Sequence, residues 1–350
     1  MMQKSDNVSI EMNYSDKEKL ERLRHTFDLN YRVTELYAAY LERFPELITK
    51  EMVDELTSDG YISKEEAVAA IISLAFGLDD AVGGDDRRII REYVRPSVRI
   101  LDTKRYTENK YYKNIKIDNI KDGRWELRKE SYAPYRAVIC GDIEIKSDFT
   151  EIAPLGFFDE EFHFPAVLED GNEWMTLTPV DLDTCDEAIE RARGRVVTFG
   201  LGLGYYAYMV SEKEDVESIT VIEKSEDVIR LFKRCILPQF SYPEKVRIIC
   251  ADAFEYAEFD MPKENYDFAF VDTWRDASDG APMYERMKPN EAKNPKTEFS
   301  YWIENFLISR LRAFKFEELY KKVKTGAEDA PKSYEEFTER LISDGRDTRL

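Results

Sequence analysis

Three glycines alternate with other residues at a predicted strand-to-helix turn: Gly200, Gly202 and Gly204. An apolar β-branched run at 196–199 precedes them, and an apolar run at 205–210 follows. Glycine at such a turn supplies free φ angles and removes side chains, so that a ligand can lie against bare backbone at the start of a helix. The spacing therefore predicts a ligand-binding pocket at this turn.

Three further apolar runs, each predicted to be a parallel strand, end beside a carboxylate. They lie at 219–222, 246–250 and 266–271, and the acids are Glu223, Asp252 and Asp272. Parallel strands present their carboxyl ends at one edge of the sheet, where open α/β sheets bind ligands. Any single carboxylate there could simply cap the helix that follows. Their common register with the glycine turn favours a shared site, in which Glu223 is placed to accept both hydrogens of a ribose diol.

The spacing of the glycines distinguishes between cofactors. A dinucleotide fingerprint needs a third glycine where this chain has Tyr205. The GxGxG form, with the acids after the second and third strands, resembles class I S-adenosylmethionine-dependent methyltransferases, and more loosely the spermidine-synthase branch of that fold. The resemblance covers residues 176–279.

The resemblance implies a Rossmann-like domain that binds S-adenosylmethionine. In that family the glycine loop packs against the methionine part of the cofactor, and Glu223 would take the ribose hydroxyls. Asp252 with Ala253 would contact the adenine, and Asp272 would face the reacting groups.

The chain departs from the family pattern at three places. Thr198 stands two places before the first glycine, where most such methyltransferases have an acid that contacts the amino group of the cofactor. The sequence after the fourth strand, 272–275, lacks the Asn/Asp-Pro-Pro-aromatic motif, which argues against amide and adenine-amine acceptors. The final strands of the family sheet are not visible, because 290–323 has a helical pattern.

Methyl transfer from a sulfonium needs mainly alignment, because the attack is in line and the leaving group is neutral. The scarcity of histidine, with only two in the chain, is then no obstacle. If a proton must be removed, Asp272 is the candidate base and Asp276 its neighbour, since paired carboxylates raise one pKa. The alternative is that Asp272 only orients the substrate.

These features predict a methyltransferase acting on a small-molecule or protein nucleophile that the sequence does not identify. One alternative is a spermidine-synthase-like aminopropyltransferase using decarboxylated S-adenosylmethionine. The other is a non-catalytic nucleotide-binding or interaction protein on the same fold.

The wider pattern divides the α/β chain into four parts. We expect a helical N-terminal region (1–110), a β-rich segment covering the substrate (111–175), the S-adenosylmethionine-binding domain (176–289) and a helical C-terminal region (290–350). Ser15 with Glu18 and Ser63 with Glu66 have capping-box spacing, which predicts two helix starts. Turn residues at 121–123, 140–142 and 169–171 predict hairpins in the β-rich segment. Chain order lets the segment 174–179 reach the methionine end of the pocket.

Composition restricts the partners. The 350 residues include 51 Lys and Arg against 71 Asp and Glu, a formal charge of −20, which makes nucleic acid an unlikely partner and favours a small molecule. No apolar run is long enough for a membrane span and no secretory signal is visible, so we expect a cytoplasmic protein. The four cysteines are expected to be buried free thiols, and no metal site is expected. The 55–66 segment has partial calcium-loop spacing, but a turn followed by a helix cap fits it better.

Overall fold

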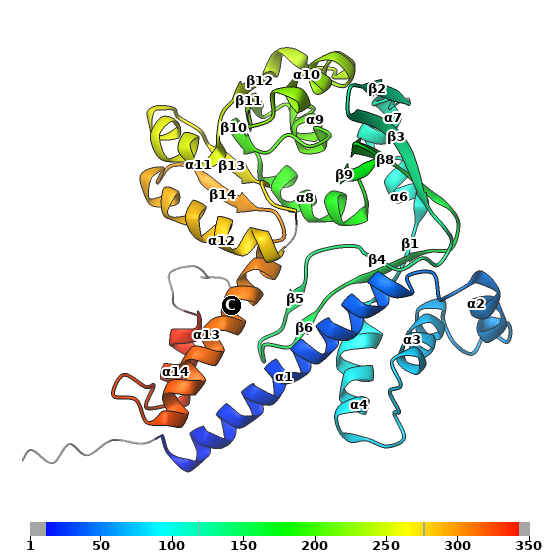
Figure 1. Ribbon diagram of the computed structural model, residues 1–350, viewed down its shortest axis with the longest axis vertical. Helices are drawn as coiled ribbons and strands as arrows, with labels where there is room; N and C mark the ends of the chain where they lie inside the picture. The colour runs from blue at the N-terminus through cyan, green and yellow to red at the C-terminus, as the bar shows by residue number, and fades with distance from the viewer. Residues whose placement is uncertain (1–11, 118, 276, 343–350) are drawn as a thin grey trace, which may run out of the picture.

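The computed structural model describes residues 12–117, 119–275 and 277–342 of a mixed α/β fold (Figure 1). The largest sheet has five strands, and all four neighbouring strand pairs in it are parallel. In spatial order the strands are β12 (Val246–Cys250), β11 (Val216–Glu223), β10 (Gly194–Phe199), β13 (Phe268–Val271) and β14 (Glu298–Tyr301). This parallel sheet agrees with the Rossmann-like expectation for the fold class.

Helices connect the parallel strands. They are α8 (Pro179–Arg191) before β10, α9 (Tyr205–Ser211) after it, α10 (Glu226–Cys235), α11 (Ala253–Glu255) and α12 (Ala277–Met287). The chain runs outward from β10 through β11 to β12 and then returns to β13 on the other side of β10. The order reverses between β10 and β13, and such a switch point opens a crevice at the carboxyl ends of the strands.

The fifth strand, β14, lies in the 290–323 segment that the sequence pattern presented as helical, where no further strand was visible. Glu298 to Tyr301 pair in parallel with β13, from Phe268 to Val271. The run is only four residues long and is followed by apolar residues at helical spacing, which is why the sequence pattern concealed it. The chain then enters α13 (Glu304–Thr325) and α14 (Tyr334–Ile342).

The middle of the chain is rich in antiparallel strands. One sheet contains β2 (Ile120–Asp122), β3 (Trp125–Tyr132), β8 (Phe162–Glu169) and β9 (Asn172–Thr176). Its two hairpins turn at the predicted 121–123 and 169–171 positions, where Gly123 and Gly171 have positive φ. Two smaller sheets contain β5 (Glu144–Ile145) with β6 (Glu151–Ile152), and β1 (Val98–Leu101), β7 (Leu155–Phe158) and β4 (Val138–Ile139). The predicted hairpin at 140–142 is wrong, because β4 pairs with β7 and β5 with β6.

The N-terminal region is helical apart from β1, a strand that the sequence did not reveal. It contains α1 (Tyr14–Arg43), α2 (Lys50–Thr57), α3 (Lys64–Ala75), α4 (Gly84–Arg88), a π-helix (Ile89–Val94), α5 (Arg95–Ser97), α6 (Thr103–Thr107) and α7 (Lys110–Asn114). The Ser63 and Glu66 capping box is confirmed at the start of α3. The box at Ser15 is wrong, because Asn13 caps α1 by accepting from the N–H of Asp16 at 2.9 Å.

Other sequence expectations have mixed outcomes. All four cysteines are free, and Cys140 and Cys185 are buried, but Cys235 is half-buried and Cys250 is exposed, so the expectation of buried thiols fails at two positions. The described ranges bring no three or more His, Cys, Asp or Glu side chains into a metal-binding group, and Glu66 of the calcium-like segment is engaged in its helix cap. No helix between residues 12 and 342, outside the two gaps, is long and apolar enough to cross a membrane.

Candidate functional site

The glycine turn lies at the switch point between β10 and β13. Gly200 has a φ of 100°, and its N–H donates to the carbonyl of Ile222 at the end of β11. A Cβ atom at Gly200 would lie 1.9 Å from the backbone carbonyl oxygen of Asp272. The first glycine is therefore required by close approach of two backbone segments, which brings Asp272 directly beside the turn.

The other two glycines face side chains. A Cβ at Gly202 would lie 2.4 Å from both Sδ and Cε of Met175, and one at Gly204 would lie 2.3 Å from the ring of Phe232. Gly204 is also left-handed, with a φ of 74°, and begins α9. Packing within the chain thus accounts for each glycine, so the glycine spacing is not by itself proof of a ligand.

Glu223 ends β11 and joins two backbone segments. Its Oε2 accepts from the N–H of Leu201 in the glycine turn at 3.3 Å, and its Oε1 accepts from the N–H of Ser225 at 2.7 Å. Each carboxylate oxygen has a second acceptor position. The partly buried side chain is thereby fixed beside the turn with acceptor capacity left for a diol.

Asp252 follows β12 and caps α11, accepting from the N–H groups of Phe254 and Glu255 at 3.0 and 3.2 Å. Burial opposes its ionisation, but these N–H groups and Lys224 outweigh burial, so the pKa of Asp252 is lowered. Ala253 is the first residue of α11. The helix-cap interpretation is correct for Asp252, and its expected adenine contact stays a prediction.

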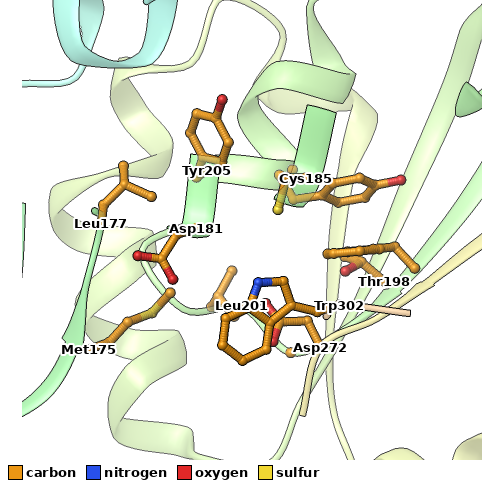
Figure 2. Close-up of a pocket in the computed structure, with 13 residues that line it drawn as sticks. Met175, Leu177, Asp181, Cys185, Thr198, Leu201, Tyr205, Asp272 and Trp302 are labelled. Atoms are coloured by element: carbon orange, nitrogen blue, oxygen red, sulfur yellow. The ribbon is translucent and has the colours of Figure 1, made fainter. Parts of the chain in front are cut away.

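A small cavity of about 30 Å³ lies beside the turn at the ends of β10 and β13 (Figure 2). Its lining is mostly apolar and aromatic, and it includes two carboxylic acids, Asp181 and Asp272. The remaining lining residues are Met175, Leu177, Cys185, Thr198, Gly200, Leu201, Tyr205, Tyr206, Ala207, Phe270 and Trp302. No Lys, Arg or His from the described parts of the chain is among them.

Both acids in the cavity bind protons more tightly than usual. Burial raises the pKa of Asp272 to about 8, and the neighbouring carboxylate of Asp181 adds to the rise. Burial also raises the pKa of Asp181 to about 6, against hydrogen bonds from Thr178 that favour its charged form. No hydrogen bond to the Asp272 carboxylate comes from any described residue. The cavity therefore contains acids that lack a cationic partner in the described chain.

Sequence reasoning missed Asp181. It lies in the first turn of α8, where its Oδ2 accepts from the backbone N–H and the hydroxyl of Thr178 at 2.7 and 2.9 Å. The available signal was the capping-box spacing of these two residues just before the glycine strand. Met175 and Leu177, from the segment expected to reach the pocket, line the cavity, and their place at the methionine end stays a prediction.

The remaining site expectations divide as follows. Glu223, Asp252 and Asp272 follow neighbouring or nearby strand ends of one sheet, at the same edge as the glycine turn. Asp276, the expected neighbour of Asp272, lies outside the described residues. The second acid in the cavity is instead Asp181, which precedes the glycine turn in the sequence, whereas Asp276 follows it.

Comparisons with known proteins give structural neighbours only. The sequence matches no protein-family model, and it matches no curated protein. Solved structures that match part of the chain include two spermidine synthases. The enzyme from Thermotoga maritima is 18% identical with a TM-score of 0.29, and the match covers 43% of this chain and 55% of that enzyme. A spermidine synthase in complex with the transition state analogue AdoDATO is 17% identical with a TM-score of 0.30, and covers 43% and 54%. The match thus spans about half the length of these structures.

Proposed function

We propose that this protein is an S-adenosylmethionine-dependent methyltransferase with a class I-type binding domain, acting on a small-molecule or protein nucleophile. One observation carries the proposal: the Asp272 carboxylate lies in a cavity beside the glycine turn, at the switch point of the parallel sheet. When bound, the donor supplies a methyl group on a positively charged sulfur. Acids without a cationic partner suit such a ligand, because a buried negative charge is stabilised by a positive one.

Each part of the donor would contact a different strand end of this chain. Gly200, Gly202 and Gly204 would hold the methionine end against backbone, and Glu223 would accept from the ribose hydroxyls. Asp252 with Ala253 would lie at the adenine. The resemblance of the sequence motifs implies these roles, and the placing of the strand ends along one sheet edge is compatible with them.

Asp272 is proposed to face the acceptor. The acceptor atom bonds to the methyl carbon as the carbon–sulfur bond breaks and its electron pair remains on sulfur. If the acceptor loses a proton, the Asp272 carboxylate takes it, and a pKa of about 8 suits a base working near neutral pH. If no proton is lost, Asp272 orients the acceptor.

Calorimetric titration with S-adenosylhomocysteine tests the cofactor class. Replacing Glu223 by Ala should weaken binding by about 1.5–3 kcal/mol, the value of hydrogen bonds to a charged group. The matched control is Glu226→Ala, which removes an exposed carboxylate three residues away. The absence of binding to the wild-type chain would contradict the proposal.

A specific observation favours aminopropyl transfer as the second candidate. The described residues lining the cavity include two acids and no cation, so the carboxylate of S-adenosylmethionine would lack a positively charged partner there. Decarboxylated S-adenosylmethionine carries only the ammonium at that end. An assay with both donors and a panel of amines decides between them, because transfer only from the decarboxylated donor excludes the methyltransferase proposal.

A further inference from the structure

The cavity contains the carboxylate of Asp181, although the strand that leads into the glycine turn supplies no acid. Thr198 occupies the position from which an acid would contact the amino group of the donor, as the sequence resemblance implies. Asp181 lines the same cavity as Thr198 and Gly200, although it lies 17 residues before Thr198 and belongs to α8 rather than β10 (Figure 2). The fold thus brings the acid Asp181 into the same cavity as Thr198, the neutral residue of β10.

Asp181 is held in place by its own helix start. Both hydrogen bonds from Thr178 go to Oδ2, at 2.7 Å from the backbone N–H and 2.9 Å from the hydroxyl, rather than to Oδ1. Thr178 is itself buried, with 5% of its surface exposed. The side chain is therefore fixed from one side, and no Lys or Arg among the described residues pairs with it.

The cavity has the character of a site for a small cation. Its volume of about 30 Å³ exceeds the roughly 10–15 Å³ that one water-sized group needs. The aromatic residues Tyr205, Tyr206 and Trp302 are among its lining residues, and aromatic rings can attract ammonium groups. The hydroxyl of Tyr206, whose residue is only 7% exposed, is buried without a hydrogen-bond partner in the described structure. A buried hydroxyl without a partner, on a residue that lines the cavity, is consistent with a polar ligand there.

We infer that Asp181 binds the ammonium group at the amino-acid or aminopropyl end of the donor, in place of the acid that Thr198 does not supply. This inference rests on the proposed nucleoside donor and applies to either candidate reaction. Asp272 remains available to the acceptor. The two acids of the cavity then have separate partners, and the ammonium group offsets the buried negative charge of Asp181.

The test uses the full-length chain and two probes in calorimetry. S-adenosylhomocysteine carries the ammonium group, whereas 5′-methylthioadenosine has the same nucleoside without the amino-acid part. Asp181→Asn should weaken binding of S-adenosylhomocysteine about 10-fold or more and leave binding of methylthioadenosine within about twofold. Asn retains an oxygen that can accept from Thr178. The control Asp186→Asn changes an exposed acid of the same helix and should alter neither affinity.

Each outcome decides the role of Asp181. Equal weakening of both probes would show a structural role, and an unchanged affinity for S-adenosylhomocysteine would show that the ammonium binds elsewhere; both overturn the inference while leaving the proposed function intact. Wild-type protein that binds neither probe overturns the proposed function and this inference with it. If the Asn variant fails to fold, wild-type protein is titrated with N-acetylated S-adenosylhomocysteine. An affinity loss of about 10-fold supports ammonium recognition by a carboxylate, and no loss overturns it.

Discussion

Acidic residues with similar positions in the sequence have opposite protonation behaviour in this site. Asp252 and Asp272 each follow a parallel strand. Asp252 accepts two helix N–H groups and its pKa is lowered, whereas burial beside Asp181 raises the pKa of Asp272 to about 8. Environments that push two pKa values apart separate a permanent anion from a group that exchanges protons near neutral pH. This difference favours Asp272 over Asp252 as the residue at the reacting centre.

The raised pKa of Asp272 predicts a stability that falls with pH. Folding raises this pKa from the ordinary 3.8 to about 8, so the folded chain binds the proton more tightly than the unfolded chain. The resulting stabilisation is complete below about pH 4 and is lost as pH rises through about 8. Between pH 5 and 9, wild type should therefore lose at least about 1.4 kcal/mol relative to Asp272→Asn, the value of one pKa unit.

Urea unfolding of both proteins across this pH range measures the difference. Asp260→Asn, at an exposed acid on the surface, is the control and should run parallel to wild type at every pH. A constant difference between wild type and Asp272→Asn from pH 5 to 9 would contradict the raised pKa.

Sequence reasoning identified the residues that follow strand ends, because strand, turn and acid are adjacent along the chain. Glu223, Asp252 and Asp272 were found in this way. Asp181 was not, because its place in the cavity depends on how α8 packs against the sheet. Its partnership with Asp272 joins residues 91 positions apart in the sequence, a separation that no local pattern encodes.

At the scale of elements, the start of α13 depends on a residue from a distant loop. Ile303, which precedes the helix, has a left-handed φ of 48° and offers no side-chain cap. Asp142 accepts instead from the N–H groups of Asn305 and Phe306 at 2.9 and 3.0 Å. The 140–142 segment, interpreted from sequence as a hairpin turn, thus caps a helix more than 160 residues later. The turn residues were identified correctly but their partner was not.

Removing this cap should weaken the connection between the β-rich segment and α13. We expect Asp142→Ala to destabilise the fold by about 1–3 kcal/mol, since two helix N–H groups lose their acceptor. Asp142→Asn keeps an acceptor for one of these N–H groups and turns its amide NH₂ toward the other, so it should recover only part of this loss. Urea unfolding of the three proteins measures both effects, and equal stability of Asp142→Ala and wild type would show that the cap contributes little.

The glycine turn offers a second test at this scale, because its glycines meet different kinds of atoms. A Cβ at Gly200 would collide with a backbone carbonyl at 1.9 Å, whereas one at Gly202 would meet the flexible end of Met175 at 2.4 Å. Gly202→Ala should lower the free energy of unfolding by about 1–2 kcal/mol, because its backbone is left-handed. Gly200→Ala should lower the free energy of unfolding by about 1–3 kcal/mol more, because the backbone carbonyl of Asp272 cannot move aside as the Met175 side chain can.

Thermal unfolding of the two variants gives the order of these costs. Gly202→Ala combined with Met175→Ala separates the steric part from the backbone part, since the shorter side chain leaves room for the new methyl group. Greater damage from Gly202→Ala than from Gly200→Ala would contradict the geometry of the turn.

At the scale of the whole molecule, the first described helix packs with the last two. The first half of α1 shares a hydrophobic cluster with α13 and α14, at the lower left of Figure 1. Its main members are Leu20, Leu23, Phe316, Leu319, Phe337 and Leu341. The hydroxyl of Tyr320 and the ammonium of Lys324 also reach Glu21, about 300 residues earlier. Helical periodicity predicted these helices separately, but only tertiary packing determines that they pair.

Because the cluster joins α1 to α13 and α14, a substitution that destabilises α14 should also destabilise the packing of α1. Phe337 is completely buried, so Phe337→Ala should cost about 3–5 kcal/mol of local stability by leaving a cavity. Hydrogen exchange should then speed up in α14 and also in the first half of α1, whereas the parallel sheet, which has a separate core, should keep its protection. Phe314→Ala, at a site on α13 that is 63% exposed, is the control and should change little. Loss of protection confined to α14 would mean that α1 is held by other contacts, and that the tail is an appendage rather than a structural partner of the N-terminal helix.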